Sequence, residues 1–153
     1  MFTVRAREQR AIFQERTMSA VENKQLFQDI FAGLSVGDGS RFVDSLADDF
    51  CWTITGTTAW SGTYRGKEAV RSTLLRPLFA QFADRYISVL HRIVAEGDCV
   101  VIECRGRVTT KTGKPFNNTS CWVCRVVDGK LKELTEYMDT ELVVTALLPP
   151  RAA

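Results

Sequence analysis

The sequence contains a single histidine, His91, and has almost no excess of charge of either sign. The 20 lysine and arginine residues nearly balance 18 acidic residues, for a net charge of +2, and they are scattered along the chain. This balance gives no reason to expect a nucleic-acid partner. With one imidazole, and with carboxylates that lack a recognisable ligand spacing, no metal site is predicted. No cofactor is predicted either, because Gly37-Asp38-Gly39 is too short for a dinucleotide-binding motif.

Long hydrophobic runs are also missing. No apolar stretch approaches the roughly 18–20 residues that cross a bilayer, and the N-terminus lacks the apolar core of a signal peptide. We therefore expect no membrane association and a cytoplasmic location.

The cysteines are too few and too widely placed for a disulfide framework. There are 5 of them, an odd number, and they lie in strand-like segments, which favours reduced core residues. Cys121 and Cys124 form a C-x-x-C pair, the spacing used in redox and zinc sites. This pair lies in the middle of a predicted strand, where an odd separation places the two thiols on opposite faces of the sheet.

The length and composition predict one domain. A chain of 153 residues with 45% apolar content can bury one substantial core but not two. We place this domain at 18–148, followed by a tail at 149–153. Residues 1–17 show little periodicity and are predicted to be a disordered extension, either translated or read from an upstream start codon that the cell does not use. The alternative is a helical arm that packs Ile12 and Phe13 on a partner.

Helices are predicted where apolar residues recur every three or four positions. Ser19 and Glu22 form a capping box at the start of the first helix, which Gly37-Asp38-Gly39 ends. Pro77 is expected to bend the third helix because proline removes an internal hydrogen bond. The second predicted helix is Ser40–Ala47, and the third is Lys67–Phe82. A short C-terminal helix begins at Asp139 or Thr140 and ends at Leu147.

The remaining segments alternate as strands do. Thr112-Gly113-Lys114 and Asp128-Gly129 have tight-turn sequences and join the last three strands. The predicted strands are Phe50–Thr55, Arg85–Ala95, Cys99–Lys111, Pro115–Val127 and Lys130–Asp139. The predicted fold class is therefore α+β, with three N-terminal helices wrapped on a curved, cone-shaped antiparallel sheet whose open end holds a small pocket.

This order of elements resembles the SnoaL-like and ketosteroid isomerase-like branch of the nuclear transport factor 2-like superfamily. The resemblance is carried by Leu46-Ala47-Asp48-Asp49-Phe50, the Ser61–Val70 segment, Thr112–Asn118, and Asp128-Gly129-Lys130 before Glu136–Thr140. It implies the cystatin-like α+β roll, a pocket for a small hydrophobic molecule, and a homodimer formed through the outer face of the sheet. The same fold serves isomerases, cyclases, hydrolases and binding domains.

The residues of ketosteroid isomerases are not matched. The position of their catalytic aspartate corresponds to about Ile54, which cannot take a proton. The tyrosine that supports their oxyanion corresponds to Ile30 or Phe31. We therefore expect no steroid-type enolisation.

Limonene epoxide hydrolases resemble the chain more closely from Gly113 to Asp139. Their second catalytic aspartate corresponds to Glu136, and their Arg-x-Asp pair corresponds to Glu103-Cys104-Arg105 with the two charges exchanged. Their water-holding tyrosine corresponds to Trp52, whose indole donates a hydrogen bond but cannot accept one.

These matches predict a catalytic group in which Glu136 is the base, Arg105 orients or stabilises an anion, and Glu103 is the acid partner. Ion pairing with Arg105 favours the ionised carboxylates, whereas burial disfavours them. The pKa values of Glu136 and Glu103 would therefore differ. The alternative is that the three charges satisfy one another, or that strand parity turns them to solvent or to a dimer interface. The predicted pocket residues are Trp52, Ile54, Tyr64, His91 and Trp122.

Two of these pocket residues have a second interpretation. Tyr64 lies in an aromatic loop that either rims the pocket or covers a sheet edge. His91 shares a predicted strand face with Val89 and Ile93, so it enters the pocket or is a satisfied core residue. Whether the protein is an enzyme stays open at this stage. It is either a cofactor-independent acid/base enzyme or a ligand-binding or accessory domain.

Overall fold

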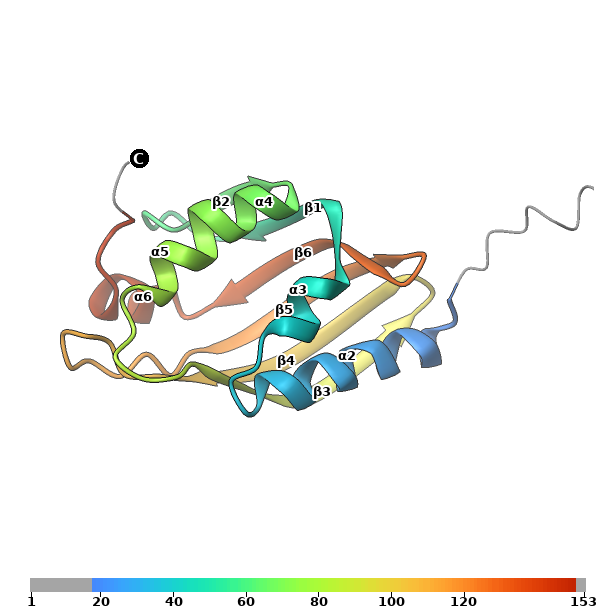
Figure 1. Cartoon of the computed structure of the whole chain (residues 1–153), viewed down its shortest axis with the longest axis horizontal. Helices are drawn as coiled ribbons and strands as arrows, with labels where there is room; N and C mark the ends of the chain where they lie inside the picture. Colours follow the sequence, from blue (N-terminus) through green and yellow to red (C-terminus); the bar gives the residue numbers. More distant parts are fainter. Residues whose placement is uncertain (1–17, 151–153) are drawn as a thin grey trace, which may run out of the picture.

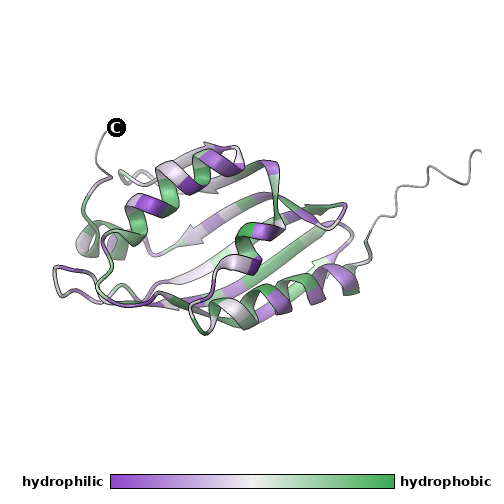
Figure 2. Ribbon diagram, viewed as in Figure 1, coloured by the Kyte–Doolittle hydropathy of each residue, from purple (hydrophilic) through white to green (hydrophobic). Residues whose placement is uncertain are grey.

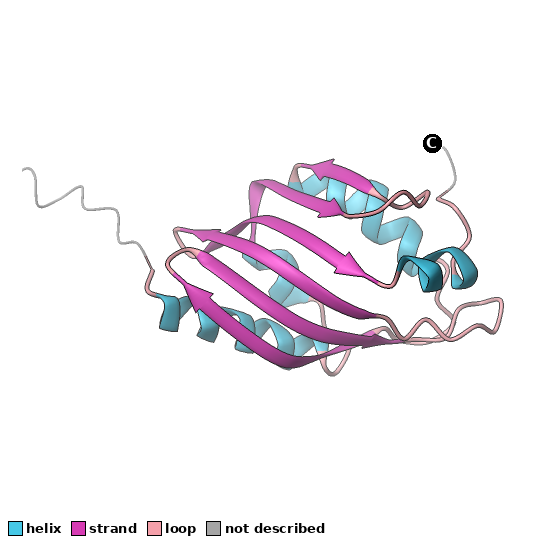
Figure 3. Ribbon diagram, turned by 180° about the vertical axis from the view of Figure 1, so that it is seen from behind, coloured by secondary structure: helices cyan, strands magenta, loops and turns pink. Residues whose placement is uncertain are grey.

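A curved six-stranded sheet forms the centre of the computed structural model, which describes residues 18–150 (Figures 1 and 3). The strand order is β2-β1-β6-β5-β4-β3. Every neighbouring pair is antiparallel except β1 and β6, which run parallel. The strands are β1 (Leu46–Ile54), β2 (Gly62–Arg65), β3 (Ile87–Glu96), β4 (Cys99–Arg107), β5 (Thr119–Val127) and β6 (Lys130–Met138).

The helices α2 to α5 lie on one face of this sheet, and Figure 3 looks at the other face. Ser19 caps α2 with the expected box, since its hydroxyl accepts from Glu22 N and the Glu22 carboxylate accepts from Ser19 N. Asp139 caps α6, accepting from Leu142 N. The helices are α2 (Ala20–Leu34), α3 (Ser40–Ser45), α4 (Lys67–Ala69), a π-helix (Val70–Leu75), α5 (Arg76–Phe79) and α6 (Thr140–Ala146).

The predicted α+β class is confirmed, but the sheet differs from the prediction in its edge and in one pairing. The segment Gly62–Arg65, predicted as part of a loop, is strand β2 and pairs with β1. The parallel β1–β6 pair replaces the expected fully antiparallel arrangement. A four-residue edge strand with little burial has almost no periodic signal, so pattern alone does not reveal it.

The predicted third helix is interrupted by the π-helix Val70–Leu75, where Arg76 N donates to Arg71 O. Pro77 follows immediately. It has no N–H for the Thr73 carbonyl, and its ring needs space beside that carbonyl. The wider π turn provides that space, and it also brings Leu74 and Leu75 to the inner face of the sheet.

Alternation along the strands separates a buried inner face from an outer face. In β4 and β5 the even-numbered residues are buried. The inner face packs against helix residues Phe27, Ile30 and Phe31 to form the core. Figure 2 shows α2 banded by hydropathy, as an amphipathic helix on a core should be.

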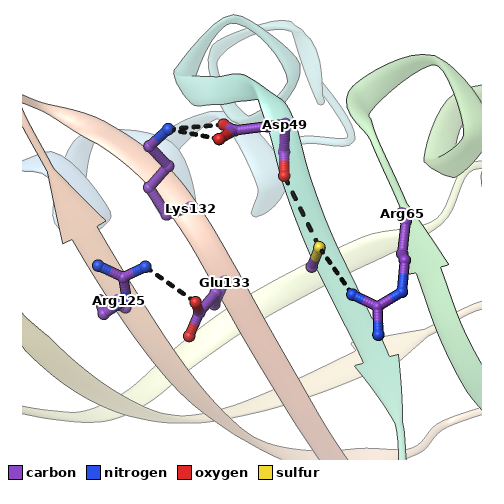
Figure 4. Close-up of polar contacts among 6 residues, drawn as sticks. Asp49, Arg65, Arg125, Lys132 and Glu133 are labelled. Carbon is purple, nitrogen blue, oxygen red and sulfur yellow. Dashed lines mark hydrogen bonds and ion pairs between the residues drawn. The ribbon is translucent and has the colours of Figure 1, made fainter.

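The outer face carries β-branched and charged side chains. Val94, Val101, Val123 and Thr135 are register partners in a row that crosses four strands. Nearby, Lys132 bonds both Asp49 oxygens at 2.6 and 2.8 Å, and Arg125 pairs with Glu133 at 2.9 Å (Figure 4). We name this surface the outer face.

The cysteines lie as predicted from strand parity. Cys124 is buried, whereas Cys121 points to the outer face and is half-buried, and all five thiols are free. Burial raises the pKa of Cys104 to about 12, so this thiol stays protonated. The predicted disorder of residues 1–17 lies outside the described residues. Among residues 18–150, no helix is long and apolar enough to cross a membrane.

Candidate functional site

A cavity of about 130 Å³ lies between the inner face of the sheet and the helices. Its walls are almost entirely apolar, with aromatic side chains from several elements: Phe42, Trp52, Trp60, Phe79, Tyr86, Phe116 and Trp122. The polar residues that reach it are Ser88, Asn118, Ser120 and Glu136. Among residues 18–150, Glu136 is therefore the only residue with a carboxyl side chain on the cavity wall.

Glu136 lies on β6 and is held by side chains of the two neighbouring strands, β1 and β5. It pairs in register with Trp122 on β5 and with Ile54 on β1. Trp122 Nε1 donates to Glu136 Oε1 at 3.0 Å, and Trp52 Nε1 donates to Glu136 Oε2 at 3.1 Å. Each carboxyl oxygen therefore accepts one indole N–H, and the side chain is only 8% exposed.

Burial raises the pKa of Glu136, because the charged form loses solvation in the apolar cavity. Hydrogen bonds from Trp122, Ser120 and Trp52 act in the opposite direction but do not cancel this effect. In the part of the chain that the structure describes, no arginine, lysine or histidine lines the cavity to compensate. A carboxyl with a raised pKa can exchange a proton nearer to neutral pH than an exposed glutamate can.

Tyr86 is a second ionisable group at the cavity and was not predicted from the sequence. Burial, with a smaller contribution from Glu136, raises its pKa far above the usual range, so the hydroxyl remains a donor. Gly106 makes this position possible, because a Cβ there would collide with the Tyr86 hydroxyl and ring. The unusual glycine within a predicted strand was the available signal, since glycine in a strand often marks close packing.

The expected group of Glu136, Arg105 and Glu103 is not formed. Odd-numbered residues of β4 point to the outer face, so Glu103 and Arg105 lie on the opposite side of the sheet from Glu136. Glu103 instead pairs with Arg92 at 3.8 Å. Glu103 and Arg105, which correspond to the Arg-x-Asp pair of epoxide hydrolases with the charges exchanged, therefore do not reach the cavity.

The structure also separates the predicted pocket residues into two sets. Trp52, Ile54 and Trp122 line the cavity. Tyr64 does not, because it lies on edge strand β2 and its hydroxyl donates to Trp60 O at 3.0 Å. Of that aromatic loop, Trp60 reaches the cavity instead.

His91 lies outside as well, because β3 is irregular. The register of β3 against β4 shifts between Leu90 and Arg92, so His91 and Arg92 are both exposed while Ile93 packs on the core. His91 and Arg105 line an open hollow on the outer face. Period-2 counting predicted the wrong side here because a β-bulge adds one residue to the count.

Within residues 18–150, no group of three or more histidine, cysteine or acidic side chains is arranged to hold a metal ion. Among these residues, the cavity wall has one carboxyl group, that of Glu136. Its two oxygens already accept hydrogen bonds from the indoles of Trp52 and Trp122.

The chain belongs to the SnoaL-like domain family, whose model matches residues 27–134. This family lies in the superfamily of nuclear transport factor 2-like folds, in agreement with the resemblance carried by the sequence motifs. The matched range contains both tryptophan donors, and it ends two positions before Glu136.

Solved structures support the same assignment. An NTF2-like protein from Burkholderia thailandensis is 28% identical, with a TM-score of 0.69, and the match covers 82% of this chain and 96% of that one. An NTF2-like protein from Burkholderia xenovorans is 26% identical over 84% and 98% of the two chains, with a TM-score of 0.64. The protein TerC, co-crystallised with polyporic acid, has a TM-score of 0.69 at 18% identity, over 81% and 96% of the chains. No curated protein matches the chain.

Proposed function

We propose that the protein binds a small hydrophobic molecule in the inner cavity and that Glu136 transfers a proton on it. The observation that carries this proposal is a buried carboxyl group, 8% exposed, on the wall of an otherwise apolar cavity. Proteins rarely bury an acid without an ion-pair partner unless the acid has a task. The structural relative TerC was co-crystallised with polyporic acid, which supports the binding of a small organic molecule by this fold.

The reaction that suits this wall is an isomerisation or a cyclisation. Glu136 is the only carboxyl there, so one group must act as base and then as acid. As a carboxylate it takes a proton from a C–H or O–H of the ligand, and the bonding electron pair stays on the ligand. The protonated Glu136 then returns that proton at another atom, so no cofactor is consumed. Hydrolysis with separate acid and base carboxyls is less well supported, because Glu103 lies on the outer face.

The raised pKa of Glu136 favours this role. A general base works best when its pKa lies near the operating pH, and burial moves Glu136 in that direction. The indole bonds from Trp52 and Trp122 fix the orientation of the carboxyl. A fixed orientation reduces the entropy lost when the reacting atoms meet.

A second candidate is a ligand-binding or accessory domain without turnover. It is favoured by the same hydrogen bonds, because Trp52, Trp122 and Ser120 together satisfy the carboxylate without any ligand. In that case Glu136 serves to select and orient the bound molecule.

Exchange of hydrogen with solvent distinguishes the two candidates. The protein is incubated in D₂O with a panel of small uncharged ketones and enols, and deuterium incorporation is followed by NMR. The proposal predicts exchange by the wild type and a loss of about 100-fold or more in Glu136→Gln. Glu133→Gln on the outer side of the same strand is the matched control and should retain the rate. Exchange that survives in Glu136→Gln would exclude Glu136 as the base, and binding without exchange would favour the second candidate.

We also retain two proposals that follow from the sequence. The protein is proposed to be cytoplasmic and to form a homodimer through the outer face. The dimer is supported by the exposed apolar row on that face, where Val94 is 55% exposed and Val123 is 37% exposed.

A further inference from the structure

The cavity around Glu136 limits the size of its ligand. An apolar cavity of roughly 150 Å³ holds one benzene molecule, and this cavity measures about 130 Å³. The walls on both sides are rigid parts of the core, since Leu74 is 1% exposed and Val143 is 3% exposed. A ligand with several fused or linked rings would have to displace such side chains, and interiors packed at native density resist that displacement.

The cavity also limits the charge of its ligand. Of the described residues, 18–150, those that line it include the Glu136 carboxyl and no cationic side chain. A bound carboxylate or phosphate would be desolvated beside a buried acid with no arginine, lysine or histidine to pair with, which is costly at this depth. Anionic molecules are therefore disfavoured by both desolvation and repulsion.

The polar atoms of the wall show how the ligand is oriented. Tyr86 and Ser88 lie in the same cavity as Glu136, and Ser88 is only 1% exposed. Ser88 Oγ is buried beside the Tyr86 hydroxyl and the Cys104 thiol, with which it can hydrogen-bond. Asn118 is engaged by both backbone groups of Asp139, at 3.0 Å each. The groups that can still bond a ligand are the Tyr86 hydroxyl, as a donor, and the Glu136 carboxylate, whose oxygens each accept one indole N–H and keep a further lone pair.

We propose that the ligand of this cavity is an uncharged molecule of about one six-membered ring, with a hydroxyl group that accepts a hydrogen bond from Tyr86 and donates one to Glu136. This inference rests on the proposed function, because it takes the Glu136 cavity as the ligand site. Its aromatic and aliphatic walls surround the ring, and the single oxygen meets the few polar groups.

A panel of four probes tests size, charge and polarity separately. Phenol is the predicted type, toluene lacks the oxygen, benzoate adds a negative charge, and a three-ring phenol exceeds the cavity. Binding is measured by isothermal titration and by the fluorescence of Trp52 and Trp122, whose indoles contact Glu136. We expect saturable binding of phenol, binding of toluene that is at least about 10-fold weaker, corresponding to the ~1.4 kcal/mol of one hydrogen bond, and none of benzoate or the three-ring phenol.

Two variants identify the polar contact. Tyr86→Phe should weaken phenol about 10-fold and leave toluene unchanged, because only the hydroxyl is removed. Tyr137→Phe, on the outer face of the same sheet and 52% exposed, is the matched control and should change neither. A phenol-to-toluene ratio that stays the same in Tyr86→Phe would overturn the proposed orientation.

Each remaining outcome also decides one part of the inference. Binding of benzoate as tight as that of phenol would overturn the charge limit, and equal binding of the three-ring phenol would overturn the size limit. Failure of all four probes to bind would overturn the ligand class. These results are independent of the deuterium exchange test, because a ligand can bind as predicted while Glu136→Gln leaves exchange unchanged.

Discussion

Trp122 and Glu136 are cross-strand partners on β5 and β6, and the indole Nε1 of Trp122 donates a 3.0 Å hydrogen bond to Glu136 Oε1. This bond joins a buried donor to the one acid of the cavity. It opposes the effect of burial on the pKa of Glu136. The chemistry of the cavity therefore depends on a pair that the antiparallel register of two neighbouring strands creates.

Trp122→Phe should raise the pKa of Glu136 further, because a donor that stabilises the carboxylate is lost. The same change should destabilise the fold by about 1–3 kcal/mol, since a buried hydrogen bond to a charged group disappears. The pKa is measured from the ¹³C chemical shift of the Glu136 carboxyl carbon against pH, and stability from urea unfolding.

Trp60→Phe is the control for this change. It also loses an indole bond, to Leu148 O at 3.0 Å, but that bond does not involve Glu136. The carboxyl pKa should therefore stay at its wild-type value in Trp60→Phe. An unchanged titration in Trp122→Phe would mean that the bond does not influence the acid.

The pH dependence of stability should reveal the buried acid. Burial raises the pKa of Glu136 in the folded state above its usual value, so the folded state holds its proton more tightly than the unfolded state does. Its contribution to stability is full below about pH 4.5 and declines as pH rises through the folded pKa. The wild type should thus lose stability relative to Glu136→Gln across that range, measured by urea unfolding at a series of pH values.

Glu133, on the same strand, should show the opposite dependence of stability on pH. Its hydrogen bond with Arg125 lowers the pKa of the Glu133 carboxyl. The contribution of this pair is present above the unfolded pKa and is lost as pH falls through the folded value. Wild type and Glu133→Gln should therefore converge at low pH. Parallel curves for wild type and Glu136→Gln from pH 4.5 upward would contradict the buried-acid assignment.

Much of the fold could be predicted from the sequence because helix caps and strand alternation are local signals. The Ser19 capping box, the Asp139 cap and the opposite facing of Cys121 and Cys124 all follow from spacing. The short edge strand β2 has no such pattern. The π-helix likewise results from the geometry around Pro77, which no periodicity encodes.

The candidate site was only partly predictable, for a physical reason. Glu136 was predicted from a resemblance to limonene epoxide hydrolases, but placing Glu103 and Arg105 required knowledge of strand parity, and parity depends on register. The β-bulge at His91 turns the side chains that follow it to the opposite face of the sheet, and no sequence pattern predicts its position. Tyr86 was missed because its role depends on a space opened by Gly106 on the neighbouring strand.

Gly106→Ala should disturb the cavity from a distance. The added Cβ would meet the Tyr86 hydroxyl and ring, so the tyrosine must move or the strands must separate. Overpacking of this kind costs about 1–3 kcal/mol. Urea unfolding measures the loss, and a double-mutant cycle with Tyr86→Leu identifies its cause. The penalty of Gly106→Ala should shrink in the Tyr86→Leu background, and equal penalties in both would show that the contact is not responsible.

Val123→Glu tests the proposed dimer of the outer face. Val123 lies in the middle of the row formed with Val101 and Thr135, so a carboxylate there would be buried without a partner in a face-to-face dimer. We expect the variant to be monomeric at concentrations where the wild type is dimeric, with sedimentation velocity as the measurement. Val144→Glu, on α6 and 63% exposed, is the control and should leave the assembly unchanged. A dimer that persists in Val123→Glu but is lost in Val144→Glu would move the interface from the outer face to the surface of α6, because only a buried introduced charge disrupts association.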